Sequence, residues 1–65
     1  MAQTVEFDGC EVVAETDLAI CVEGIQDDDV WIPKSQVQDD SEVWKKGDEG
    51  TLVVSEWFAE KEGLV

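Results

Sequence analysis

The chain has 65 residues, of which 17 are Asp or Glu, four are Lys and none is His or Arg, so its net charge at pH 7 is −13. A negative field of this size excludes direct binding to nucleic acid or anionic lipid over a broad surface, and it favours a partner protein with a basic surface. The same charge also keeps a small protein soluble, and composition alone leaves both explanations open. At this length we expect one domain, residues 1–65, whose thin core favours a homodimer or a higher homo-oligomer.

Residues 1–4 lack the basic and apolar regions of a signal peptide, and no apolar run approaches the roughly 18 residues of a membrane span. We therefore expect a complete, cytoplasmic protein. Cys10 and Cys21 have no metal-ligand spacing, and no His accompanies them. In a reducing cytoplasm we expect two buried thiols, with a bridge between them as the alternative.

The first half of the chain alternates apolar and polar residues with a period of two, which predicts strands. We expect strands at residues 10–15 and 18–23, separated by a turn at Thr16 and Asp17. In the second strand three apolar side chains should share one face: Leu18, Ile20 and Val22.

Turn signals fill residues 24–29, so Asp27, Asp28 and Asp29 should lie at the tip of a hairpin. An extended run resumes at residues 29–33. Proline has no N–H to donate to a sheet, so Pro33 should end this strand or place it at an edge.

The second half begins with Ser41, which is expected to cap a short helical turn over residues 42–44 that ends at Gly47. A tight turn at residues 47–50 then leads into a strand at residues 51–54.

A short helix is expected at the end of the chain, over about residues 55–62. Ser55 suits the N-cap, and Gly63 suits the stop. A helix of two turns is too short to be stable alone, so Trp57 or Phe58 should pack on the barrel or on a second subunit. Short strands, tight turns and one terminal helix predict a mainly β fold: a small antiparallel SH3-like or OB-like barrel of four or five strands.

Three segments cover most of the chain: ETDLAICVEG at 15–24, VWIPKSQV at 30–37 and DDSEVWKKGDEGTLVVSEWFAEKEGL at 39–64. In this order they resemble a group of small proteins encoded by bacteriophages and prophages, in particular through WIPKSQ followed by GDEGTLVVSEWFAEK. The resemblance implies a phage origin and a place in the cytoplasm of the infected bacterium. It carries over no catalytic residue, because the group has no settled enzymatic activity.

Catalytic chemistry finds little support in the residue types. Ser35, Ser41 and Ser55 lack an imidazole base, and Lys34 beside Ser35 is a much weaker arrangement than a triad. We therefore expect no enzyme and no cofactor.

Metal and phosphate sites are not expected either. The acidic runs at 27–29 and 39–40 do not match the alternating pattern of a calcium loop, and adjacent strand residues point to opposite faces. The glycines of residues 47–50 flank two carboxylates, which would repel a phosphate.

One candidate ligand site lies in the WIPKSQ segment. Trp31 could stack a base, Lys34 could hold a phosphate, and Ser35 and Gln36 add a hydroxyl and an amide. The alternative is that this segment is simply a core strand, with Val30 and Ile32 facing inward.

A candidate protein-interaction site combines acidic groups, which would steer a basic partner, with large aromatic surfaces. Its members are Asp27, Asp28, Asp29, Asp39, Asp40, Glu42, Trp44 and Trp57. The acidic pair at residues 48–49 could add to the steering. The alternative for the tryptophans is that they fill the core.

The favoured hypothesis is a non-enzymatic protein that binds and inhibits or modulates a host or phage protein, in a counter-defence role such as anti-CRISPR or anti-restriction activity, with DNA mimicry as one mode. A second hypothesis is a small-molecule sponge that sequesters a nucleotide, such as a cyclic immune signal, through Trp31, Lys34, Ser35 and Gln36. A third is an accessory protein of phage DNA replication or recombination.

Overall fold

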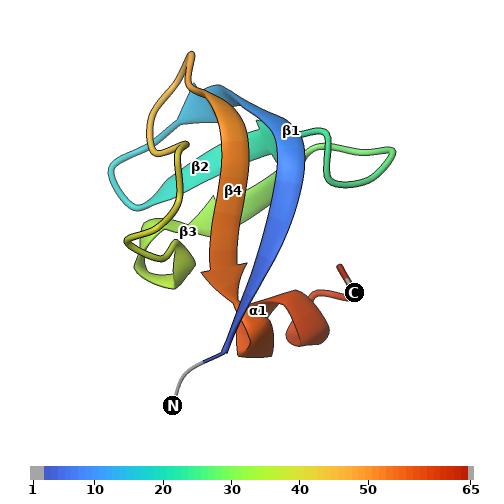
Figure 1. Cartoon of the computed structure of the whole chain (residues 1–65). Helices are drawn as coiled ribbons and strands as arrows, with labels where there is room; N and C mark the ends of the chain where they lie inside the picture. Colours follow the sequence, from blue (N-terminus) through green and yellow to red (C-terminus); the bar gives the residue numbers. More distant parts are fainter. Residues whose placement is uncertain (1–2, 65) are drawn as a thin grey trace.

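Four antiparallel strands and one short α-helix make up the computed structural model, which describes residues 3–64 (Figure 1). The sheet has the order β3-β2-β1-β4 and curls into a half-barrel. The mainly β, antiparallel small-barrel fold with a short C-terminal helix is therefore confirmed, with four strands. In chain order the elements are β1 (Thr4–Glu15), β2 (Ala19–Glu23), β3 (Val30–Pro33), a 3-10 turn η1 (Lys34–Gln36), β4 (Glu49–Ser55) and α1 (Glu56–Lys61).

The longest strand, β1, begins at Thr4, six residues before the predicted start at residue 10. It pairs with both β2 and β4, and its register with β4 shifts between Phe7 and Cys10. Gly9 lies in this irregularity at φ +70°, a backbone conformation that glycine adopts most readily. The chain also passes close by here, because a Cβ on Gly24 would lie 2.7 Å from the carbonyl oxygen of Gly9. The irregularity at Gly9 bends β1, which pairs with β4 along one part of its length and with β2 along the other.

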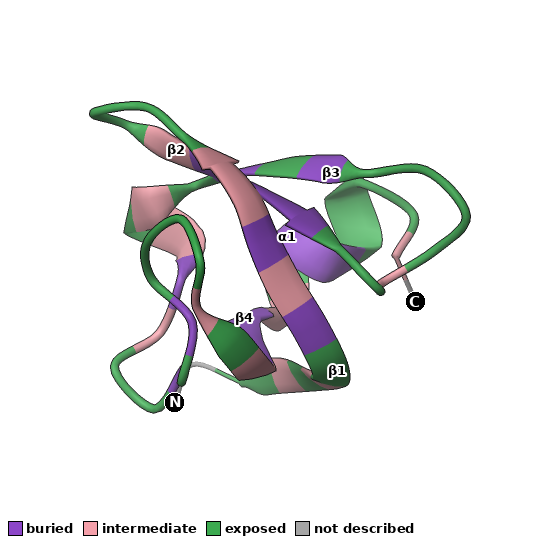
Figure 2. Cartoon of the chain, turned by 90° about the horizontal axis from the view of Figure 1, so that it is seen from above, coloured by how far each residue is buried: buried purple, intermediate pink, exposed green. Residues whose placement is uncertain are grey.

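The inner face of the sheet carries the core. Figure 2 shows buried segments alternating with more exposed ones along β1. The buried core residues are Cys10, Val12, Ile20, Val22, Val30, Ile32, Val37, Val43, Leu52, Val54, Phe58 and Ala59. The strand β3 follows the expected alternation, with Val30 and Ile32 inside and Trp31 outside.

The helix α1 covers one end of this core (Figure 1). Ser55 is its N-cap, and its hydroxyl accepts a hydrogen bond from the N–H of Phe58 at 3.2 Å, as predicted. Phe58 is the aromatic residue that packs inward, whereas Trp57 is 61% exposed. The observed helix has six residues, and no helix among residues 3–64 is long enough to cross a membrane.

Two local predictions are wrong. Leu18 does not join Ile20 and Val22 inside, because it lies in the turn before β2 and is 81% exposed. The hydroxyl of Thr16 shapes that turn by accepting the N–H of Ala19 at 3.1 Å. Residues 42–44 form no helical turn, because the buried hydroxyl of Ser41 bonds both the N–H and the carbonyl of Val43 and holds the chain in a tight non-helical loop.

Both cysteines are free thiols. Cys10 lies in the core on the inner face, whereas Cys21 pairs with Trp31 across the strands and shares its outer face. The sheet separates the two side chains, which excludes a bridge within one chain. Burial raises the pKa of each thiol above its ordinary value.

Candidate protein-interaction surface

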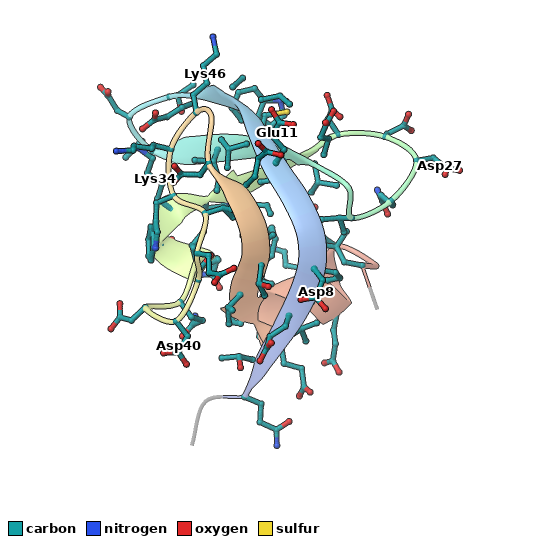
Figure 3. The ribbon with its side chains drawn as sticks, turned by 45° about the horizontal axis from the view of Figure 1, so that its top comes forward. Asp8, Glu11, Asp27, Lys34, Asp40 and Lys46 are labelled. Atoms are coloured by element: carbon teal, nitrogen blue, oxygen red, sulfur yellow. The ribbon has the colours of Figure 1, made fainter. Side chains whose placement is uncertain are left out.

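The outer face of the sheet carries a row of three carboxylates on three neighbouring strands. Glu11 on β1 is directly opposite Glu23 on β2 and directly opposite Glu49 on β4. Side chains directly opposite each other lie on the same face, with Cβ atoms about 4.5–5.5 Å apart. Glu11 therefore stands between two like charges. We call these three residues the carboxylate row; Figure 3 labels its central member.

No cation balances this row among the described residues. The one ion pair in residues 3–64 joins the Nζ of Lys34 to Oε2 of Glu15 at 2.8 Å. Like charges directly opposite in a sheet destabilise the pairing. The fold thus keeps three adjacent negative charges against their own repulsion, and departures of this kind concentrate at functional sites.

Two further carboxylates bond to Thr51 on β4, one through its side chain and one through its main chain. The hydroxyl of Thr51 donates to Oδ1 of Asp8 at 2.9 Å, and its N–H donates to Oε1 of Glu42 at 2.9 Å. Thr51 is two residues from Glu49 and so shares its face. We call the carboxylate row together with Asp8 the acidic face; its members are Asp8, Glu11, Glu23 and Glu49. Glu42 lies at the edge of β4, where a Cβ on Gly50, the partner of the core residue Cys10, would meet its Oε1 at 2.7 Å.

Sequence reasoning identified Glu42 and Glu49 as candidate residues but missed Asp8, Glu11 and Glu23. The alternation of Val5 and Phe7 with acidic neighbours was a usable signal for the early start of β1. The register that aligns Glu11 with two partners depends on the irregularity at Gly9, which no local pattern reveals.

The other predicted acidic residues lie elsewhere. Asp27, Asp28 and Asp29 are exposed in the loop between β2 and β3, and Asp39 and Asp40 are exposed in the loop before β4. Figure 3 shows Asp27 and Asp40 projecting from different loops, far apart in the view. The acidic residues of these two loops therefore do not form one patch. Within the described part of the chain, no three carboxylate or cysteine side chains are placed to hold a metal ion.

The two predicted aromatic contacts differ in setting. Trp44 is 37% exposed, and its indole N–H donates to the carbonyl of Ser41 at 2.9 Å, so it helps to hold the loop before β4. Trp57 stands on the exposed side of α1, where the Nζ of Lys61 lies 4.9 Å from its ring centroid.

Two carboxylates outside the acidic face have structural partners. Oε2 of Glu15 accepts from Lys34 and Oε1 from the N–H of Lys46 at 3.2 Å, and these bonds lower the pKa of Glu15. Asp48 accepts from the N–H groups of Trp44 and Lys45, which lowers its pKa. These bonds tie the end of β1 to η1 and fix the loop before β4.

The predicted nucleotide-binding residues are not brought together on one surface of the single chain. Trp31 projects from the outer face. The side chain of Lys34 instead donates to Glu15. Glu15 lies opposite Ile20, whose side chain is on the inner face. Ser35 is exposed, and the side-chain oxygen of Gln36 accepts from the hydroxyl of Ser55 at 2.6 Å.

Comparison of the chain with protein-family models, with curated proteins and with solved structures finds no match. The resemblance to phage proteins therefore stays a prediction. The chemistry of the acidic face is that of an acceptor: carboxylates take charge-assisted hydrogen bonds from Arg and Lys, which are stronger than neutral ones.

Proposed function

We propose that this protein is a non-enzymatic binding protein that presents its acidic face to the basic surface of a nucleic-acid-binding protein, and so inhibits or modulates it. The single observation that carries the proposal is the carboxylate row, three like charges aligned across three strands, none of which forms an ion pair within residues 3–64. An alignment that destabilises the sheet has a use if a basic partner supplies the missing positive charge.

The spacing of the row supports mimicry of a nucleic-acid backbone. Neighbouring strands lie about 4.7–4.9 Å apart, so the row repeats negative charge at that interval. One strand of duplex DNA carries one charge per about 3.4 Å of helix axis, a similar scale. A protein surface built to bind phosphates would therefore meet several carboxylates at once.

The biological setting follows from the phage resemblance. Counter-defence, in which the partner is a host nuclease or another defence enzyme, is the setting we propose. A partner from phage DNA replication or recombination would use the same face, so the identity of the bound protein decides between the two.

Affinity capture tests the proposal. The full chain with a C-terminal tag would be immobilised, a lysate of phage-infected bacteria passed over it, and bound protein eluted with short duplex DNA and identified by mass spectrometry. We expect basic nucleic-acid-binding proteins in the DNA eluate, with retention falling as salt is raised.

Two triple variants make the test specific. Glu11→Gln, Glu23→Gln and Glu49→Gln together neutralise the carboxylate row, and Asp27→Asn, Asp28→Asn and Asp29→Asn neutralise three charges in the loop between β2 and β3. Each changes the net charge from −13 to −10 (−13 + 3). We expect the first variant to lose the captured protein and the second to keep it. Equal loss in both would show that net charge alone is responsible and would reject the acidic face as the site.

A further inference from the structure

The two edges of the sheet differ in how they are finished. The outer edge of β4 is covered by the loop that precedes this strand. Val37 bridges to Val54, and the N–H of Gln38 donates to the carbonyl of Val53 at 2.8 Å. Figure 1 shows this segment running beside β4 on the side away from β1. The opposite edge, β3, pairs with β2 on one side, and no other backbone in residues 3–64 bonds to Val30–Pro33.

The pairing register shows which backbone groups β3 leaves free. The N–H of Lys34 donates to the carbonyl of Leu18 at 2.8 Å, and Ile32 pairs with Ile20 in the same register. Backbone groups alternate in direction along an antiparallel strand. Ile32 therefore bonds to β2, while the N–H and carbonyl of Trp31 point away from the sheet. Pro33 also faces outward, where its missing N–H removes no bond to β2.

This edge has weak protection at its centre. Natural sheets protect open edges with Lys, with Pro, with bulges or with covering segments. In β3 only Pro33 and the shortness of the strand serve this purpose. Trp31 offers a free donor and a free acceptor, and its large side chain is 51% exposed beside them.

We propose that the β3 edge binds the same edge of a second copy of this chain, antiparallel and centred on Trp31. In this register each Trp31 N–H donates to the Trp31 carbonyl of the other copy, and each Asp29 N–H donates to the other Pro33 carbonyl. The contact thus has four main-chain hydrogen bonds, two between the Trp31 residues and two from Asp29 to Pro33. Pro33 contributes only its acceptor, so the Asp29 carbonyl opposite it gains no donor, and each of these outer pairs has one bond instead of two.

Side chains agree with this register. The two Trp31 rings become a cross-strand pair on the outer face, an arrangement that favours sheet pairing, and Val30 lies opposite Ile32 of the other copy on the inner face. Asp28 comes level with Lys34 of the second copy. The same patch serves both copies, so the contact closes as a two-fold dimer, and the two four-stranded sheets join into one of eight strands.

The salt dependence of this contact is opposite to that of the proposed function. Two copies that each carry −13 repel one another, so added salt should strengthen the dimer, whereas it should weaken the binding of a basic partner. The dimer does not rest on the proposed function, and either can fail without the other.

Backbone amide exchange of the full wild-type chain, measured by NMR, tests the inference at one atom pair. The Trp31 N–H has no partner among residues 3–64 of its own chain, so at low concentration it should exchange rapidly, while the N–H of Ile32 stays protected by β2. At high concentration and in about 0.5 M salt, where screening is nearly complete, we expect Trp31 exchange to slow by about tenfold or more. Exchange at Trp31 that does not change with concentration would overturn the inference, whether the protein is then a monomer or a dimer through another surface.

Sedimentation of matched variants gives a second readout. Trp31→Lys places an edge-protecting charge at the centre of β3, and Trp57→Lys makes the same change at an exposed tryptophan of α1. We expect a species of twice the chain mass for the wild type and for Trp57→Lys, and dissociation at about tenfold higher concentration for Trp31→Lys. A wild-type monomer, or equal effects of the two variants, would overturn the inference.

Discussion

The two faces of one sheet follow different rules in this protein. In the core of the inner face, apolar side chains lie opposite apolar side chains, as where Ile20 meets Ile32 and Val12 meets Val22. On the outer face the same strands place Glu11 opposite both Glu23 and Glu49. Folding alone favours the first arrangement and opposes the second. The inner face therefore follows from stability, whereas the outer face is what we expect if it binds a partner, as proposed above.

The largest effect should come from breaking the inner face. Ile20 is fully buried, so Ile20→Ala removes apolar contacts and leaves a cavity, and we expect the free energy of unfolding to fall by about 2–5 kcal/mol. In a 65-residue domain that loss can be most of the stability. Urea unfolding followed by tryptophan fluorescence measures it.

Leu18→Ala is the matched control, because Leu18 lies in the adjoining turn and is 81% exposed. Its effect should stay within about 0.5 kcal/mol. A loss as large as that of Ile20→Ala would mean that Leu18 is covered in solution, and the contrast between buried and exposed positions would fail.

A smaller effect of opposite sign is expected on the outer face. Glu11→Gln removes the central charge of the carboxylate row and relieves two like-charge contacts, so stability should rise by about 0.5 kcal/mol at low salt. The gain should shrink as salt is added, because screening weakens the repulsion in the wild type. Thermal unfolding at two salt concentrations measures both.

Glu6→Gln is a suitable comparison for that change, since Glu6 is exposed on the same strand and lies opposite Val53 instead of a carboxylate. A gain equal to that of Glu11→Gln would mean that lower net charge, and not the row, explains the result.

The smallest effect concerns pH and the end of β1. The hydrogen bond from Lys34, followed by that from the N–H of Lys46, lowers the pKa of Glu15 from its ordinary value of 4.5. A group whose pKa is lower in the folded state stabilises the fold above its unfolded pKa, and that contribution is lost as pH falls through the folded pKa. The contribution of Glu15 to wild-type stability should therefore be lost as pH drops below 4.5, and Glu15→Gln should lack this loss.

The readout is the urea midpoint measured across that pH range. Asp17→Asn removes the same charge from the neighbouring turn and serves as the control. An acid limb that is unchanged in Glu15→Gln would show that the bonds to Lys34 and Lys46 do not persist in solution.

Local chemistry was sufficient to predict several parts of this fold. The hydroxyl of Ser55 and the stop after the helix predicted α1. The missing N–H of Pro33 predicted either a strand end or an edge strand, and β3 has both features. The period of two in β3 predicted which side chains face inward. In each case the determining groups lie within a few residues of one another.

Features that depend on contacts between distant segments were not predictable in this way. The alignment of Glu11 with Glu23 and Glu49 needs the register of two strand pairs, and the irregularity at Gly9 sets one of them. Trp31 and Lys34 are close in sequence, yet Trp31 lies on the outer face of β3, whereas Lys34 lies beyond the end of this strand and pairs with Glu15. The Ser41 segment has the composition of a capped helix, but the Ser41 hydroxyl bonds to Val43 instead.

The central claim is that the acidic face is a binding surface whose charges act by position. The most direct measurement is the affinity of the DNA-eluted partner for the wild type and for the two triple variants of equal net charge, over a range of salt concentrations. The account predicts that the variant of Glu11, Glu23 and Glu49 binds at least about tenfold more weakly, with a shallower dependence on salt, while the variant of Asp27, Asp28 and Asp29 binds like the wild type. Equal affinities for the two variants would contradict it.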